Sequence, residues 1–130
     1  MKTGQPPCLC GTGLAYADCC GRYHAGPLHL QAPTAEALMR SRYSAYVLDL
    51  GTYLQDTWHA STRPADVQVF DPAVRWLGLE VRRHETLTDG SGVVEFVARS
   101  KVAGRAQRLH ESSHFVMEDG RWFYVDGDVR

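Results

Sequence analysis

Four cysteines near the start of the chain are the residues best suited to chemistry. They follow the pattern Cys-X-Cys, eight residues, Cys-Cys, and are Cys8, Cys10, Cys19 and Cys20. The rest of the chain has no cysteine, so this cluster cannot link distant segments as a disulfide framework does. Thiolates hold zinc in tetrahedral geometry, and four of them fill the site completely. The spacing therefore predicts one closed, structural zinc site, although iron could occupy the same thiolates.

The segment around these cysteines has the residues that a tight metal loop requires. Gly11 and Gly13 permit a sharp turn after the first pair, and Tyr16 and Asp18 predict a short helical turn before the second. So small a segment cannot bury enough apolar surface to fold alone. Structural zinc contributes roughly 10–16 kcal/mol in small peptides, which is enough to hold such a loop.

Three alternatives to a four-cysteine site stay open on the sequence alone. His24 could supply the fourth ligand in place of one of the adjacent cysteines. Cys19 and Cys20 could form a disulfide, or all four cysteines could be free thiols. We expect the metal site because the first residues lack the apolar stretch of a secretory signal, which predicts a cytoplasmic protein with reduced thiols.

The length and charge of the chain limit what surrounds the cysteine cluster. Its 130 residues suffice for one compact domain and a short appendage. We expect a zinc knuckle and linker at 1–33 and one folded domain at 34–130. The net charge of −1 gives no general attraction to nucleic acid or anionic membranes. No apolar run approaches the ~20 residues that a membrane span needs.

Helical periodicity begins near residue 34, where Thr34 is the expected N-cap. Apolar residues then recur at three- and four-residue spacing, which predicts one buried stripe. The stripe consists of Ala35, Leu38, Met39, Tyr43, Tyr46, Val47 and Leu50. Gly51 is expected to end this helix, and Thr52 and Gln55 form a capping-box pattern for a second short helix. The stretch 59–72 is expected to be a connection.

The chain after residue 72 is expected to form antiparallel strands. Alternating apolar residues and turn signals place them at 74–87, 93–102, 105–117 and 121–126. Leu77, Leu79 and Val81 are expected to share one face of the first strand. Asp119-Gly120 is a strong signal for a two-residue hairpin. Since only the helices are available to cover one face of this sheet, the order predicts an α+β fold.

Several segments resemble known families. The run PCLCGTGLAYADCCG resembles the SEC-C motif, a metal-binding knuckle that also ends the SecA translocation motor. Nearly the whole chain resembles the bacterial YchJ family, in the order LMRSRYSAYV, TWHAS, WLGLEV, VEFVAR, HESSHF and GRWFYVDG. The resemblance implies an N-terminal SEC-C knuckle followed by a domain similar to nuclear transport factor 2 (NTF2), also called cystatin-like. That domain is a cone, with helices packed on a curved antiparallel sheet.

Two departures from the family limit what the resemblance carries over. Some members have a second SEC-C knuckle, whereas this chain has one copy of the motif. Where the family has an Arg-Ser-Arg pattern in the third strand, this chain has Ser112-Ser113-His114. No role assigned to those arginines applies here.

The third strand carries polar residues on its apolar side. Glu111 and Ser113 share the face that bears Leu109 and Phe115. They could line a ligand cavity inside the cone, where a buried glutamate could act as an acid or base. The helical side would contribute Tyr43, Trp58 and His59. We expect instead that Glu111 pairs with Arg40 or Arg42 and that large aromatic side chains leave little spare volume.

These features favour a non-enzymatic, zinc-binding adaptor over an enzyme. The knuckle would present a rigid surface to a protein partner, which the resemblance to the SecA tail suggests is the ribosome or the protein-export machinery. The alternative is an enzyme or small-ligand binder that uses the cone cavity around Glu111. Nucleic-acid binding is the weakest hypothesis, except as contact with ribosomal RNA, because the basic residues form no single stripe. A homodimer through the outer face of the sheet is a further expectation.

Overall fold

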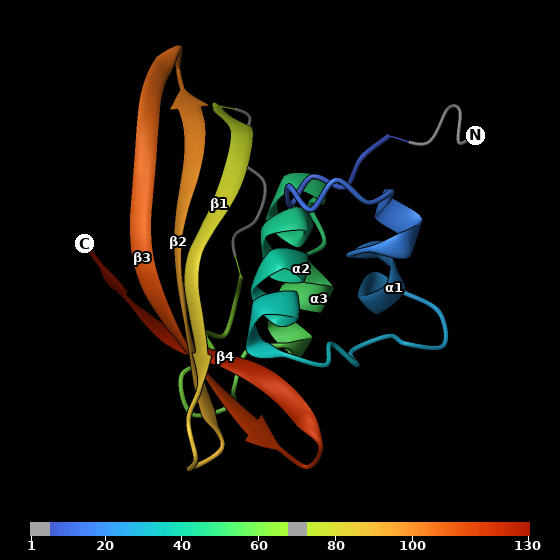
Figure 1. Ribbon diagram of the computed structural model, residues 1–130. Coiled ribbons are helices and arrows are strands. Elements are labelled where there is room, and N and C mark those ends of the chain that lie inside the picture. The colour runs from blue at the N-terminus through green and yellow to red at the C-terminus, as the bar shows by residue number, and fades with distance from the viewer. Residues whose placement is uncertain (1–5, 68–72) are drawn as a thin grey trace.

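A computed structural model describes residues 6–67 and 73–130 and has three layers (Figure 1). A four-stranded sheet forms one side, two helices lie in the middle, and the N-terminal segment lies on the far side. The strands pair antiparallel in chain order: β1 (Val74–Thr86), β2 (Ser91–Val102), β3 (Arg105–Glu118) and β4 (Arg121–Val129). The helical elements are η1 (Tyr16–Asp18), α1 (Gly21–His24), α2 (Ala35–Leu48) and α3 (Gly51–Asp56). The predicted α+β architecture is confirmed.

Two tight turns set the register of the long strands. Asp119 and Gly120 have positive φ angles of 53° and 77°, as the predicted two-residue hairpin requires. Ala103 and Gly104 join β2 to β3 in the same way, with φ angles of 51° and 81°. Both turns match the right-handed twist of the strands they connect. The expected connection at 59–72 is described only to residue 67, and its remainder lies outside the described residues.

The first long helix ends earlier than the sequence predicts. Thr34 caps its start, because its Oγ1 accepts a hydrogen bond of 3.0 Å from the Ala37 backbone N–H. The helix ends at Leu48, where Asp49 adopts the left-handed conformation with φ of 61°. Gly51 therefore begins α3 instead of ending α2. The predicted capping box is wrong, since Leu50 occupies the N-cap of α3 and no side chain caps that helix.

Helix α2 is buried on two sides, which a single apolar stripe did not predict. Its sheet-facing side includes Met39 and Tyr43, and its opposite side includes Ser41 and Ser44, each 0% exposed. The polar residues are buried because the N-terminal segment packs on the far side of α2 (Figure 1). Helix α2 thus packs against the sheet on one side and against the N-terminal segment on the other. None of the helices within 6–67 and 73–130 is long and apolar enough to cross a membrane.

A bulge in β1 changes which side chains face the helices. The pairing with β2 shifts between Trp76 and Gly78. Leu79 packs against the core, whereas Leu77 is 51% exposed. The prediction that these two leucines share a face is therefore wrong, because the extra residue at the bulge interrupts the alternation.

The last strand ties the sheet to the start of the domain. The Tyr124 backbone N–H donates to the Thr57 carbonyl at 2.8 Å, and the His59 N–H donates to the Tyr124 carbonyl at 2.7 Å. The Trp122 indole N–H donates to the Pro33 carbonyl at 3.2 Å. These bonds join β4 to segments more than sixty residues earlier.

Candidate functional site

The four cysteines converge on one point beneath the surface. All four are buried, between 0% and 6% exposed, and their Sγ atoms all lie within 4.8 Å of one another. The Sγ atoms of Cys10 and Cys19 are 3.5 Å apart. Sulfurs around a tetrahedral metal with bonds of ~2.3 Å lie about 3.8 Å apart. The donor set therefore fits one metal ion, and each of the four positions has a protein ligand.

Local backbone geometry creates this convergence. Gly11 and Gly13 have φ angles of 90° and 86°, which other residues rarely adopt, so the chain reverses directly after Cys10. The Cys8 backbone N–H then donates to the Leu14 carbonyl at 2.6 Å and closes the loop. The short helix η1 follows and presents Cys19 and Cys20, as the sequence predicts.

Because the four sulfurs lie this close together, the ionisation of one cysteine changes the pKa of the others. A hydrogen bond from Cys20 lowers the pKa of Cys10 to about 4, aided by the Thr12 backbone N–H against the opposing effect of burial. The same contact, together with burial, raises the pKa of Cys20, and burial raises the pKa of Cys19. Charge on one thiolate thus keeps protons on its neighbours. Only a cation among them could stabilise all four as thiolates, so metal binding here must release protons.

His24 is engaged elsewhere and does not complete the cluster. Its Nε2 donates to the Ser41 carbonyl at 2.8 Å, which leaves Nδ1 to accept from the Tyr16 hydroxyl at 2.5 Å. Both ring nitrogens are therefore occupied, and burial lowers the pKa of this imidazole. No disulfide joins Cys19 and Cys20. Of the alternatives that the sequence left open, the geometry favours the four-sulfur site.

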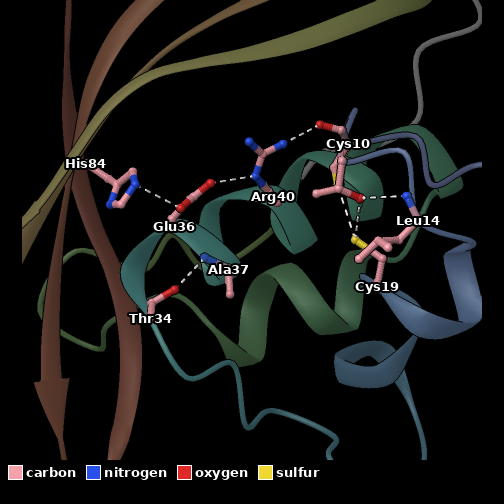
Figure 2. Close-up of polar contacts among 9 residues, drawn as sticks. Cys10, Leu14, Cys19, Thr34, Glu36, Ala37, Arg40 and His84 are labelled. Atoms are coloured by element: carbon pink, nitrogen blue, oxygen red, sulfur yellow. Dashed lines mark hydrogen bonds and ion pairs between the residues drawn. The ribbon is translucent and has the colours of Figure 1, made fainter.

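A chain of polar contacts holds the cysteine loop against α2 (Figure 2). Arg40 donates from Nη1 to the Cys10 carbonyl at 2.7 Å and from Nε to Glu36 at 2.9 Å. Glu36 also contacts His84 of β1 at 3.1 Å. Ser44 lies 3.7 Å from the Cys8 sulfur. The loop is therefore docked on the domain and linked through α2 to the sheet.

A second feature lies on the other side of α2, between this helix and the concave face of the sheet. It is a cavity of about 300 Å³. Three of the predicted pocket residues, Tyr43, Glu111 and Ser113, line it together. The other lining residues are Met39, Arg42, Tyr46, Trp76, Phe96, Ala98, Leu109, Phe115 and Tyr124. The expectation of little spare volume is wrong, because the long, curved strands hold these aromatic rings apart around an open centre.

The expected ion pair of Glu111 with Arg40 or Arg42 is also wrong. Arg40 is paired with Glu36, as described above. Arg42, 5% exposed, donates from Nη1 to the Leu54 carbonyl at 2.9 Å and to Thr57 Oγ1 at 2.6 Å. Glu111 accepts a hydrogen bond of 2.7 Å from the Ser113 hydroxyl. Within 6–67 and 73–130, no ion pair joins Glu111 to either arginine.

The remaining two predicted pocket residues lie outside the cavity. The ring of Trp58 packs against Tyr124 at a centroid distance of 5.1 Å and lies 5.0 Å from the Arg42 guanidinium carbon. His59 contacts Ser61 at 2.7 Å and Glu118 at 3.1 Å. Trp58 thus packs against the Arg42 guanidinium, and His59 contacts Glu118 at the end of β3.

Sequence reasoning considered Arg42 only as an ion-pair partner of Glu111 and did not include it among the residues that line the cavity. Met39, Arg42, Tyr43 and Tyr46 follow the i, i+3, i+4, i+7 spacing of one helix face. A charged residue inside that apolar stripe was the available signal. Trp76 gave no such signal, because only the bulge in β1 decides which way it faces.

A curved antiparallel sheet covered by helices, with a four-cysteine loop docked behind them, defines an NTF2-like domain that carries a SEC-C motif. The comparisons agree with this class. The family described as "YchJ, middle NTF2-like domain" matches residues 34–127, and the SEC-C motif matches residues 7–22. The chain belongs to the YchJ family, whose members are also named UPF0225 proteins.

Relatives and solved structures resemble the whole chain. A UPF0225 protein of Bordetella pertussis is 58% identical over 123 residues, which are 95% of this chain and 92% of the relative. A UPF0225 protein of Methylibium petroleiphilum is 60% identical over 128 residues, or 98% and 92%. The solution structure of a SEC-C motif protein from Rhodopseudomonas palustris has a TM-score of 0.82 at 34% identity, covering 96% of this chain and 99% of that one. A SEC-C motif protein from Psychrobacter arcticus gives 0.75 at 32% identity, covering 98% and 84%.

Proposed function

We propose that this protein is a zinc-binding, non-enzymatic adaptor of the cytoplasm. The single observation that carries the proposal is the closed donor set, in which four buried sulfurs surround one point. Zinc bound by four thiolates has no open position for a substrate, which is typical of structural sites. Cys8, Cys10, Cys19 and Cys20 would hold the ion, and the ion would fix the loop that displays the surface.

The surface of the cysteine loop supports a protein partner. Leu9 and Leu14 are 41% and 51% exposed, although leucine is usually buried. Exposed apolar groups on a rigid frame are typical of interaction sites. By analogy with the SEC-C tail of SecA, we propose the ribosome or the protein-export machinery as the partner.

The experiment is co-sedimentation of the zinc-loaded protein with purified ribosomes, with zinc content measured on each sample. Leu14→Ser should reduce ribosome binding while about one zinc per chain is retained. Leu77→Ser is the matched control, because Leu77 is also 51% exposed but lies on the sheet, and it should bind normally. Cys10→Ser should lose both zinc and binding.

The adaptor proposal fails if Cys10→Ser loses zinc but binds every partner as the wild type does. Ribosome binding that is absent in the wild type, with capture of export proteins by the wild type and not by Leu14→Ser, would support the other proposed partner. Equal effects of Leu14→Ser and Leu77→Ser would argue against the cysteine loop as the contact surface.

A second candidate function is favoured by the cavity. An opening of about 300 Å³ with charged side chains in its wall is at the small end of ligand-binding pockets. We propose that the cavity around Glu111 binds a small ligand. This function and the adaptor function use opposite sides of α2, so the protein can have both.

A further inference from the structure

The cavity contains a buried positive charge with unused hydrogen-bond donors. The Arg42 guanidinium has five N–H donors, and the two hydrogen bonds that it makes both start from Nη1. Its Nε and Nη2 groups have no acceptor among the residues that the structure describes, and they are not among its fully enclosed unpartnered atoms, so they are open to the cavity. The rings of Trp58 and Tyr124, 5.0 and 4.5 Å from the guanidinium carbon, hold it in place. A ligand acceptor would replace water at these donors, and a hydrogen bond to a charged group in a largely apolar cavity contributes more to binding than one between neutral groups.

The cavity also contains a carboxylate with an unused acceptor. Glu111 receives the Ser113 hydroxyl on Oε2, and Oε1 has no partner within the described part of the chain. The carboxylate lies directly against the backbone of Gly127, where a Cβ atom would overlap Oε2. Glu111 is therefore held at the wall without an ion pair to Arg42. Two opposite charges line one cavity, and neither a hydrogen bond nor an ion pair joins them within the described part of the chain.

The walls between these charges are apolar and aromatic. Tyr43 packs edge-on against Trp76 at 5.6 Å, and Phe115 packs edge-on against Tyr124 at 5.7 Å. A volume of about 300 Å³ corresponds to roughly ten water-sized groups at ~30 Å³ each. The space therefore suits a flat or compact apolar body with one small polar head.

We propose that this cavity binds a small carboxamide with an aromatic or compact aliphatic body. The amide carbonyl would accept from Arg42, the amide N–H would donate to Glu111, and the body would lie between α2 and the sheet. This inference rests on the second candidate function and names its ligand class. A neutral head suits the site because Arg42 and Glu111 together carry no net charge. A lone carboxylate would face Glu111, and a lone ammonium would face Arg42, so each would meet repulsion in a poorly hydrated space.

The test is an NMR titration of the zinc-loaded, ¹⁵N-labelled full chain with four probes that share one body. Benzamide carries both donor and acceptor, benzoate only acceptors, benzylamine only donors, and toluene neither. Benzamide should shift the Arg42 Nε–H signal and the amides of Phe96 and Ser113 saturably. It should bind about tenfold more tightly than each of the other three, as expected for hydrogen bonds to charged groups.

Two variants test whether the charges of Arg42 and Glu111 determine which polar group the cavity prefers. Glu111→Gln removes the negative charge at nearly constant size, so benzoate should gain affinity relative to benzamide and benzylamine should lose it. Glu95→Gln is the matched control, because Glu95 lies on the neighbouring strand and pairs with His110 at 2.6 Å outside the cavity. It should leave all four affinities unchanged. A purely structural role of Glu111 would lower all affinities together and would not change their order.

The outcomes separate the ligand class from the cavity function. A preference for benzamide that Glu111→Gln shifts towards benzoate supports the proposal. If toluene or benzoate shifts the cavity signals as strongly as benzamide does, the carboxamide proposal is overturned while small-ligand binding stands. If none of the probes shifts these signals, both the carboxamide and the second candidate function are overturned.

Discussion

Polar groups on the two sides of α2 differ in whether the chain itself supplies their hydrogen-bond partners. On the side of the cysteine loop, Ser44, Arg40 and His24 each contact a partner from the chain itself. On the side of the cavity, Arg42 and Glu111 each keep groups without a partner in the described structure. The first arrangement is that of a finished structural site. The second is that of a site that a ligand would complete.

Arg40 and Arg42 show the difference at its closest, since they are two residues apart on one helix. Burial opposes the charge of Arg40, but its hydrogen bonds to Glu36 and at Cys10 outweigh burial and raise its pKa. Burial lowers the pKa of Arg42 to about 10, against only weaker opposing effects. The charge of Arg40 is thus stabilised on balance, whereas the contacts of Arg42 offset the cost of burial only in part. A buried charge without a carboxylate partner indicates function more strongly than a paired one.

Removal of the metal should have the largest effect and should act on one side of α2 first. Chelation is expected to expose the backbone of residues 7–24, because four thiols without a cation cannot hold the loop closed. The free energy of unfolding should fall by several kcal/mol, less than the roughly 10–16 kcal/mol that metal gives isolated peptides. Hydrogen exchange with and without chelator measures this effect. Cys10→Ser is the control, since chelator should change it no further; unchanged exchange in the wild type would contradict the comparison.

Arg42→Met should have the next largest effect. It leaves the Leu54 carbonyl and Thr57 Oγ1 without their charged donor. We expect a loss of about 3 kcal/mol in the free energy of unfolding, measured by urea denaturation. Arg40→Met, on the partly exposed side, should cost about 1 kcal/mol. A more stable Arg42→Met variant would contradict this expectation and would show that Arg42 does not contribute to stability.

Gly127→Ala should disturb the cavity side alone. The new methyl group would overlap the Glu111 carboxylate, and because this is the flexible end of a side chain that can move, we expect a cost of about 1 kcal/mol, the low end of overpacking. Adding Glu111→Ala should recover most of this loss, which a double-mutant cycle measures. Zinc content should stay at the wild-type level. Additive effects of the two substitutions would show that the carboxylate does not rest on Gly127.

The pH dependence of His24 should be the smallest effect and should act on the side of the cysteine loop. Burial lowers the pKa of His24 below 6.5, so the folded protein favours the neutral ring. Its contribution to stability is complete above pH 6.5 and is lost as the pH falls through 6.5 towards the folded pKa. His24→Gln should therefore lower Tm more at about pH 7.5 than at about pH 5.5 in zinc-loaded protein. An equal shift of Tm at both pH values would contradict this account.

Local sequence signals predicted most of the fold. The hairpin at Asp119-Gly120, the N-cap at Thr34 and the alternation of Val94 and Phe96 depend on neighbours in the chain, and the structure confirms them. The end of α2 was wrong because Asp49 adopts a left-handed conformation that glycine was expected to supply. The face of Leu77 was wrong because a bulge depends on pairing with another strand.

The two candidate sites also differ in how far apart their residues lie in the sequence. The cysteine cluster is local in sequence, so spacing alone brought its four members together. The cavity draws on α2 and all four strands, so the sequence placed Tyr43, Glu111 and Ser113 together but also included Trp58 and His59. The partner of Glu111 depends on how far the sheet stands from the helix, and that distance has no sequence signal.

The bonds from β4 back to Pro33, Thr57 and His59 have a consequence for protein synthesis. A ribosome adds about 5–20 residues per second and releases the chain from its N-terminus. The cysteine loop therefore emerges before α2 and can bind metal early, whereas the sheet-side cover of α2 is complete only when β4 has left the exit tunnel. For several seconds the nascent chain presents a helix with one side protected and the other exposed. A loop that closes early around metal would shield half of that helix while the rest of the domain is still being made.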